Sequence, residues 1–186
     1  MAANRREFLR QVGLGLIAIH TAGAIEYLSP AEARASDAYS FQVLGADERA
    51  TLAALGEVLL PGCVTEGFCE FIDYQLSLPA EDCLLMLRYL DVPPPYAAFY
   101  AAGLAGLDGL ANAEHKQGFA RCSAEQQTAL VRQISFEQPA AWQGPPSPLF
   151  YFTLRSDAVD VYYGTEAGFE RLDIPYMAHI TPTQPW

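Results

Sequence analysis

Apolar residues recur with helical spacing along most of the chain after residue 46. In the first such stretch Leu52, Leu55 and Val58 are spaced three residues apart, and Pro61-Gly62 ends it. Apolar side chains three or four positions apart share one face of an α-helix, so this stretch is predicted to be a helix. The same reasoning predicts further helices at about 67–78, 80–90, 96–111, 123–135 and 147–163.

Local signals support the boundaries of these helices. Ser123-Ala124-Glu125-Gln126 has the form of a capping box. Ser147-Pro148 is interpreted as an N-cap followed by proline at the first helical position. Three glycines recur in the 96–111 helix, at Gly103, Gly106 and Gly109. Each costs a helix about 1 kcal/mol relative to alanine, so the spacing indicates close packing against a neighbour or fraying near the helix end.

No run of alternating apolar and polar residues predicts a strand. We therefore predict an all-α fold, a compact bundle of five to six helices followed by an irregular, aromatic-rich C-terminal tail. Helical periodicity stops after Gly164, and residues 165–186 are predicted to form a non-helical docking tail.

The C-terminal quarter concentrates the aromatic side chains. Residues 141–186 hold nine of the 22 aromatic residues. A non-helical segment this apolar is unfavourable in water, so it either packs on the chain's own helices or docks into a partner. Aromatic and methionine side chains are enriched at interface cores. The candidate partner-contacting residues are Trp142, Tyr162, Tyr163, Phe169, Tyr176, Met177, His179 and Trp186.

The first 35 residues have the features of an export signal. Arg5-Arg6 precedes an apolar run of 14 residues from Val12 to Ile25, shorter than the ~20 residues that a membrane-spanning helix needs. The pattern Arg-Arg-x-Phe-Leu resembles a twin-arginine signal, which exports proteins that have already folded. Ala33-Arg34-Ala35 fits the small-x-small rule of signal peptidase, so cleavage is expected before Ser36. A Sec signal or an uncleaved amphipathic anchor is the alternative.

This interpretation divides the chain into a twin-arginine signal peptide, residues 1–35, and a single helical domain, residues 36–186. The expected location is the periplasm. The overall composition suits a folded domain, because 51% of the residues are hydrophobic and 18% are charged.

The charge balance excludes some partners. The chain has 22 acidic and 11 basic residues, a net charge of −11, and Lys116 is its single lysine. Nucleic acid and anionic membranes both require a basic surface, which these residues cannot supply. We therefore expect no nucleic-acid partner.

Motifs for catalysis or cofactor binding are not found in the sequence. His115 and His179 lie outside any E-x-x-H or H-E-x-x-H frame, and there is no G-x-S-x-G or P-loop motif. The G-x-G-x-x-A pattern at Gly13–Ala18 follows no predicted strand, so it does not indicate a dinucleotide site. We expect no catalytic residue, no metal ligand and no cofactor site in this chain.

Clustered acidic residues on the predicted helices are interpreted as surface. Asp157 and Asp160 lie one turn apart on the last helix, without a histidine to complete a metal site. Glu66, Glu70 and Asp73 share a face of the second helix. Both sets are expected to be solvated or interface-facing edges.

The four cysteines, Cys63, Cys69, Cys83 and Cys122, match no haem or iron–sulfur spacing. An even number of cysteines in an exported protein indicates disulfides, and four allow three pairings. Cys63–Cys69 is the best local candidate because both flank one loop, whereas Cys83, within a predicted helix, can be a buried thiol. Folding in a reducing cytosol before export would make any disulfide a late addition.

Together with the leader, several segments resemble the gluconate 2-dehydrogenase subunit 3 family. The similarity extends from residue 46 to the C-terminus. The segments that carry it are Leu52–Gly62, Phe71–Asp73, Tyr100–Asp108, Tyr163–Leu172 and Ile174–Met177.

The resemblance implies a non-catalytic small subunit of a membrane-associated flavin dehydrogenase complex. The large subunit of such complexes resembles glucose–methanol–choline oxidoreductases, binds FAD and oxidises a sugar, sugar acid or glycoside. It commonly lacks a signal of its own, so the small subunit carries it through the twin-arginine pathway and stabilises it. A cytochrome c subunit usually accepts the electrons. No cofactor is implied for the small subunit itself.

Two other functions stay open from the residues alone. The chain could be an independent exported enzyme that uses His179 with acidic neighbours. It could also be an electron-transfer or metal-binding module built on the cysteines. If the chain is the small subunit that the resemblance implies, His179 either reaches the substrate cavity of the partner or is an ordinary surface histidine.

Overall fold

The structure, a computed structural model, describes residues 16–21, 24–36 and 39–174. Most of this part of the chain is helical, which confirms the all-α prediction. The α-helices are α2 (Pro30–Ala35), α3 (Ala46–Leu59), α4 (Phe68–Ser77), α5 (Tyr96–His115), α6 (Ala124–Phe136), α7 (Ser147–Tyr163) and α8 (Glu166–Arg171). The other described elements are the 3₁₀ helices η1 (Met86–Leu90) and η2 (Phe119–Arg121) and the strands β1 (Ile17–Thr21) and β2 (Ala24–Leu28).

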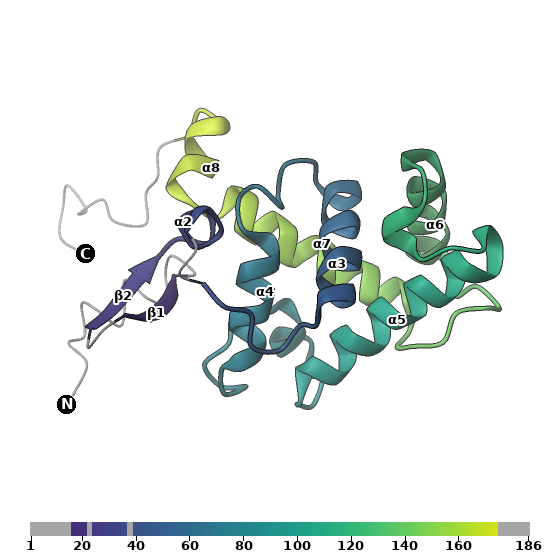
Figure 1. The fold of residues 1–186 in the computed structure, drawn as a ribbon, viewed down its shortest axis with the longest axis horizontal. Coiled ribbons are helices and arrows are strands. Elements are labelled where there is room, and N and C mark those ends of the chain that lie inside the picture. The colour runs from purple at the N-terminus through teal and green to yellow at the C-terminus, as the bar shows by residue number, and fades with distance from the viewer. Residues whose placement is uncertain (1–15, 22–23, 37–38, 175–186) are drawn as a thin grey trace, which may run out of the picture.

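Helix α7 lies at the centre of the bundle. It contacts α3, α4, α5, α6 and α8. Figure 1 shows α5 and α6 toward one end of the molecule and α2, α8 and the β-hairpin toward the other. Phe68, Tyr100 and Phe150 are fully buried between these helices, and removing such apolar side chains from water is the main force holding the bundle together.

Two of the three α5 glycines allow close packing. A Cβ atom at Gly103 would lie 2.2 Å from the ring of Phe150, and one at Gly106 would lie 3.3 Å from Trp142. Gly109 faces open space. The close-packing interpretation is therefore confirmed for Gly103 and Gly106 and does not apply to Gly109.

The helix predicted over 80–90 is not formed. The segment is a turn followed by η1, because side chains from two other helices take its backbone amides. Gln75 Oε1 accepts the N–H of Leu84 at 2.7 Å, and Asp157 Oδ1 accepts the N–H of Met86 at 2.8 Å. In an α-helix these amides would bond to carbonyls four residues earlier.

The start of α7 also differs from the prediction. Pro146 is the N-cap and Ser147 is the first helical residue, so the predicted N-cap is wrong by one position. The hydroxyl of Ser147 donates to the carbonyl of Glu137 at 2.9 Å and joins α7 to the end of α6. The capping box of α6 is confirmed, since Ser123 and Gln126 exchange hydrogen bonds.

A short antiparallel hairpin forms inside the predicted leader, which contradicts the expectation of no strand. Ile17 pairs with Leu28, and Ile17 and Ile19 are both buried, because alternate residues of a strand share a face. With Ala33 of α2 they form a second hydrophobic cluster, separate from the main core, against which Tyr39 and Tyr74 pack.

Beyond Gly164, the described part of the chain contains one further short helix. The prediction of a non-helical tail is wrong for Glu166–Arg171, which form α8, with Thr165 as its N-cap. The Thr165 hydroxyl accepts the N–H of Gly168 at 3.1 Å. Residues 175–186, the rest of the predicted docking tail, lie outside the described residues.

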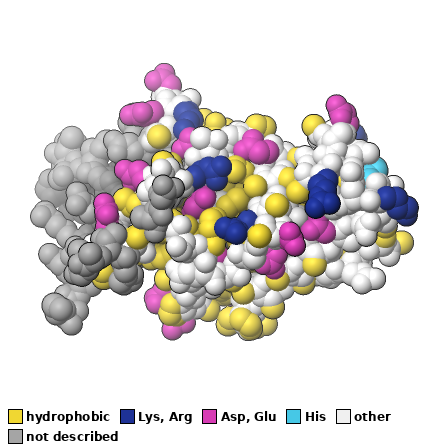
Figure 2. All heavy atoms as spheres, in the orientation of Figure 1, with side chains coloured by type: hydrophobic (Ala, Val, Ile, Leu, Met, Phe, Trp, Pro, Cys, Tyr) yellow, Lys and Arg dark blue, Asp and Glu magenta, His cyan; other side chains and the backbone are white. Residues whose placement is uncertain are grey.

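Charged side chains of both signs are mixed on the face of the molecule that Figure 2 draws. Figure 2 shows acidic side chains spread across one face of the molecule with basic side chains between them. Among the helices that the structure describes, none is both long and apolar enough to cross a membrane.

Candidate partner interface

The residues predicted to contact a partner fall into three groups in the structure. Tyr162, Tyr163 and Phe169 lie together where α7 meets α8, and we call this region the α7–α8 junction. Trp142 lies in the main core. The remaining four lie outside the described residues: Tyr176, Met177, His179 and Trp186.

Trp142 is a core residue, which corrects its assignment as a partner contact. Its side chain is 5% exposed, and its ring centroid lies 5.7 Å from that of Phe150. The indole N–H donates to the carbonyl of Pro145 at 2.7 Å. The loop before α7 therefore folds the indole under α5, at Gly106, instead of presenting it to solvent.

The aromatic pair of the junction is packed from several sides. The rings of Tyr162 and Tyr163 meet edge to face at 4.8 Å, and both residues are half-buried. Gly62, with φ +91°, brings the loop after α3 against Tyr162, where an added Cβ would lie 3.3 Å from the ring. These contacts hold the C-terminal end of α7 against the loop that follows α3.

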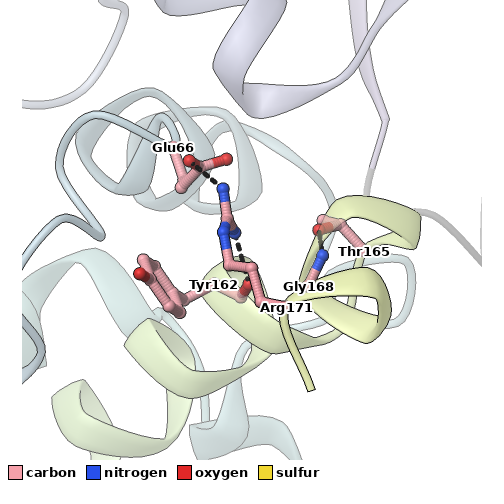
Figure 3. A network of polar contacts seen from close by, with 5 residues as sticks. All are labelled: Glu66, Tyr162, Thr165, Gly168 and Arg171. Carbon is pink, nitrogen blue, oxygen red and sulfur yellow. Dashed lines mark hydrogen bonds and ion pairs between the residues drawn. The ribbon is translucent and has the colours of Figure 1, made fainter. Parts of the chain in front are cut away.

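Arg171 connects α8 to the rest of the junction. Figure 3 shows its guanidinium above the ring of Tyr162, at 4.6 Å from the ring centroid, and paired with Glu66. The guanidinium also donates to the carbonyl of Tyr162 at 3.2 Å. Because the two charged side chains are partly exposed, their ion pair is worth about 1 kcal/mol or less, and its main effect is to orient α8.

Apolar surface is exposed where the described chain ends. Leu172 and Ile174, directly after α8, are 47% and 50% exposed. The N–H of Ile174 bonds to the carbonyl of Phe169 at 3.1 Å, so this apolar end is held against α8. Neighbouring exposed apolar side chains are typical of a surface that a partner covers.

A hollow of about 420 Å³ separates the junction from α2. It is lined by Pro30 and Ala31 on one side and by Thr165 and Ala167 on the other. Three carboxylates also line it, from Glu32, Glu66 and Glu170. Glu32 accepts hydrogen bonds from the backbone N–H and the hydroxyl of Ser29. These bonds, of which the backbone bond has the larger effect, hold the pKa of Glu32 below its usual range. The hollow is therefore suited to a cationic group more than to an anion.

A larger and more open hollow, about 810 Å³, lies on the outer face of α6. Phe136 lines it and is 80% exposed. It is lined by α6 residues and Glu137 and contains none of the residues predicted to contact a partner. We therefore base the candidate interface on the α7–α8 junction.

Among the described residues, Asp157 is the carboxyl group with the most strongly perturbed pKa, and the sequence interpretation of this residue as part of a solvated or interface-facing edge is wrong. It is fully buried, and it accepts hydrogen bonds from the Met86 amide at 2.8 Å and the Tyr100 hydroxyl at 2.6 Å. Burial raises its pKa to about 7. Perturbed carboxyls are common in active sites, but these donors bind η1 and α5 to α7, so the role of Asp157 is structural.

Asp73 and Glu70 are also buried, contrary to the surface interpretation of their helix face. Asp73 accepts four hydrogen bonds, from the Tyr39 hydroxyl at 2.7 Å and from the amides of Gln42, Val43 and Leu44 at 2.7–2.9 Å. These bonds fix the arm that precedes α3. Nothing in the local pattern around Asp73 signals this, since its partners lie about 30 residues earlier.

The cysteines are free and buried in the structure, and the predicted Cys63–Cys69 disulfide is not formed. Burial raises the pKa of both Cys63 and Cys69 to about 12, which leaves little reactive thiolate near neutral pH. Within residues 16–21, 24–36 and 39–174, no three His, Cys, Asp or Glu side chains are grouped to hold a metal ion. The described geometry therefore gives no support to a cysteine-based metal or electron-transfer site.

Comparison with known proteins identifies a family that the chain matches. A family model described as gluconate 2-dehydrogenase subunit 3 matches residues 46–179. This range contains α3 to α8 and the whole α7–α8 junction. No curated protein and no solved structure matches the chain.

Proposed function

Because the chain belongs to the gluconate 2-dehydrogenase subunit 3 family, we propose that it is the non-catalytic subunit that escorts and stabilises the catalytic subunit of a dehydrogenase complex. The family match over residues 46–179 is the observation that carries this proposal. Membership in a family of subunits implies a catalytic partner. The proposed escort and stabilisation of that partner go beyond family membership and require experimental tests.

The proposed partner is an FAD-binding subunit of the glucose–methanol–choline type. FAD, held in that subunit, would accept the hydride from a sugar, sugar acid or glycoside. A cytochrome c subunit would then take the electrons. The role of the chain itself is to bind and hold the folded partner.

Export explains why such a subunit carries a leader. A twin-arginine signal moves folded cargo, so a partner bound before export can cross with this chain and needs no signal of its own. Arg5-Arg6 at the start of the leader supports this route. The complex would act in the periplasm, next to the inner membrane.

The proposed contact surface is the α7–α8 junction together with the residues that follow it. Its support is the half-buried Tyr162–Tyr163 pair, the exposed side chains of Leu172 and Ile174, and the orientation of α8 by Arg171. Ordered aromatic anchors lose little conformational freedom on binding, which favours affinity.

Affinity capture of the chain from its native periplasm tests the proposal. We expect a second, larger polypeptide to co-purify and the eluate to show flavin absorption. The matched control carries Arg5→Lys and Arg6→Lys, which should leave both subunits in the cytoplasm. A colourless eluate that contains this chain alone would contradict the escort function.

Two truncations locate the contact surface. A chain that ends at Gly164 lacks α8 and everything after it, whereas a chain that ends at Ile174 keeps α8. We expect the shorter chain to keep its helical circular dichroism and to lose the catalytic subunit. Full co-purification by the shorter chain would show that α8 and the residues after it are not needed for contact with the catalytic subunit.

A further inference from the structure

Helix α2, inside the predicted leader, is seated on α4 by a close backbone contact. The carbonyl of Pro30 lies where a side chain of residue 67 would be, since a Cβ atom at Gly67 would be 2.0 Å from the Pro30 oxygen. Gly67 has φ +86°, a conformation that favours glycine. The start of α4 therefore has a shape that accepts a turn of another chain segment.

Glu70, in the first turn of α4, supplies a charge to the same surface. The residue is 6% exposed, and its carboxylate pairs with Arg34 through one contact, Nη1 to Oε1, at 3.4 Å. The other oxygen, Oε2, is buried and has no hydrogen-bond partner. A buried acceptor without a partner costs free energy, and a guanidinium can donate to both carboxylate oxygens at once. Arg34 thus pairs with only one of the two carboxylate oxygens of Glu70.

An apolar surface lies beside Glu70. Tyr74 of α4 and Tyr39 of the preceding arm are half-buried and pack against Ile17, Ile19 and Ala33. Cleavage before Ser36 would remove all three of these leader residues. Gly67, Glu70, Tyr74 and Tyr39 would then form one vacant surface, which we call the α4 seat.

We propose that the α4 seat binds an arginine-bearing segment of the catalytic subunit after the leader has been removed, and that α2 and the β-hairpin occupy it before. The inference rests on the proposed function and names a second contact for the same partner. The α7–α8 junction holds the catalytic subunit during export, and the α4 seat engages it afterwards. A basic segment also complements the cleaved chain, because residues 36–186 have 7 basic and 19 acidic residues, a net charge of −12.

Photo-crosslinking in the purified complex tests this assignment. A benzoylphenylalanine replaces Tyr74 in the α4 seat or, as the control, Phe136 on α6 at the other end of the molecule. The residue at 74 should crosslink to the catalytic subunit. A complex that forms normally but shows no such crosslink overturns the α4 seat while leaving the proposed function intact.

The state of the leader is measured in the same samples. Intact mass should show that the chain in the complex begins at Ser36. In a complex made with Ala35→Gln, which replaces the small residue that signal peptidase requires, position 74 should crosslink to residues 16–36 instead. A full-length chain in the wild-type complex, crosslinked to its own leader, overturns the proposal. Failure to capture any catalytic subunit is a separate result, which contradicts the proposed function itself.

A charge variant tests the chemistry of the occupant. Glu70→Gln keeps the shape of the side chain and removes the charge that a guanidinium would pair with. We expect dissociation of the cleaved complex to become at least about tenfold faster, because a charge-assisted pair is lost from a buried position. Glu125→Gln, on the exposed start of α6, should have no effect. Equal dissociation rates for the wild type and Glu70→Gln would contradict an arginine at the α4 seat.

Discussion

At the scale of single residues, the clearest contrast lies between two glycines of α5. Gly103→Ala places a methyl group 2.2 Å from the Phe150 ring, and such overpacking should lower the free energy of unfolding by about 1–3 kcal/mol. Gly109→Ala meets no atom within 4 Å and should raise the free energy by about 0.5–1 kcal/mol, because alanine is the better helix former. Urea unfolding measures both, and a shift of the same sign in the two variants would contradict the packing of α5 on α7.

Asp157 should make stability depend on pH. Its folded-state pKa, about 7, is above the value near 3.9 expected in the unfolded chain, so the folded state holds the proton more tightly. The contribution of Asp157 to stability is complete below about pH 4 and is lost as the pH rises to about 7. Asp157→Asn mimics the protonated acid, since the amide can accept from Met86 and donate to Tyr100.

The difference in unfolding free energy between Asp157→Asn and the wild type should therefore move in favour of the variant as the pH rises. The slope should be at most about 1.4 kcal/mol per pH unit between pH 4 and 7, measured by urea unfolding. Tyr100→Phe, the control, removes one hydrogen bond and keeps the carboxyl. Parallel pH profiles of Asp157→Asn and the wild type would show that Asp157 does not titrate in this range.

At the scale of elements, a helix could be predicted from the sequence wherever its apolar spacing agreed with a local start or stop signal. Apolar spacing and the Pro61-Gly62 stop predicted α3, and the capping box predicted the start of α6. The helix over 80–90 could not be excluded, because the groups that prevent it, Gln75 and Asp157, come from α4 and α7. Long-range hydrogen bonds to backbone amides leave no trace in local periodicity.

Short elements were missed for a different reason. Helix α8 has six residues, less than two turns, so no apolar period can develop in it. In β1 the outward position between Ile17 and Ile19 is Ala18, also apolar, so the alternation is hidden. In the candidate interface, the clustering of aromatics pointed to Tyr162 and Tyr163, whose contact with a partner stays a prediction. The burial of Trp142 depends on Gly106, in a separate helix, and could not be read from the local sequence.

The contribution of Arg171 to holding α8 in place can be tested. Arg171→Met removes the pair with Glu66 and the cation over Tyr162 but keeps an unbranched apolar stem in place of the aliphatic part of arginine. We expect amide exchange within α8 to become about fivefold faster, the equivalent of about 1 kcal/mol, while global unfolding is unchanged. Arg155→Met, on the exposed side of α7, is the matched control. Unchanged exchange in α8 would show that other contacts orient it.

At the scale of the whole molecule, two hydrophobic clusters of unequal size predict two levels of stability. Ile17 belongs to the small cluster of the leader, and Leu107 belongs to the main core. Ile17→Ala should speed both the amide exchange of residues 24–36 and tryptic cleavage after Arg34, with no change in the main unfolding transition. Leu107→Ala should lower the free energy of that transition by about 2–5 kcal/mol. Loss of the main transition in Ile17→Ala would show that the two clusters unfold as one unit.

The four hydrogen bonds to Asp73 have a consequence for timing. They anchor residues 39–44, so the leader is joined through a short connection to a point fixed on α4. While that connection is intact, the leader competes for its binding surface at an effective concentration on the order of millimolar. Cleavage before Ser36 turns the leader into a free peptide, which competes only at its concentration in solution. Cleavage of one peptide bond would thus determine when the α4 seat becomes available to the catalytic subunit after export.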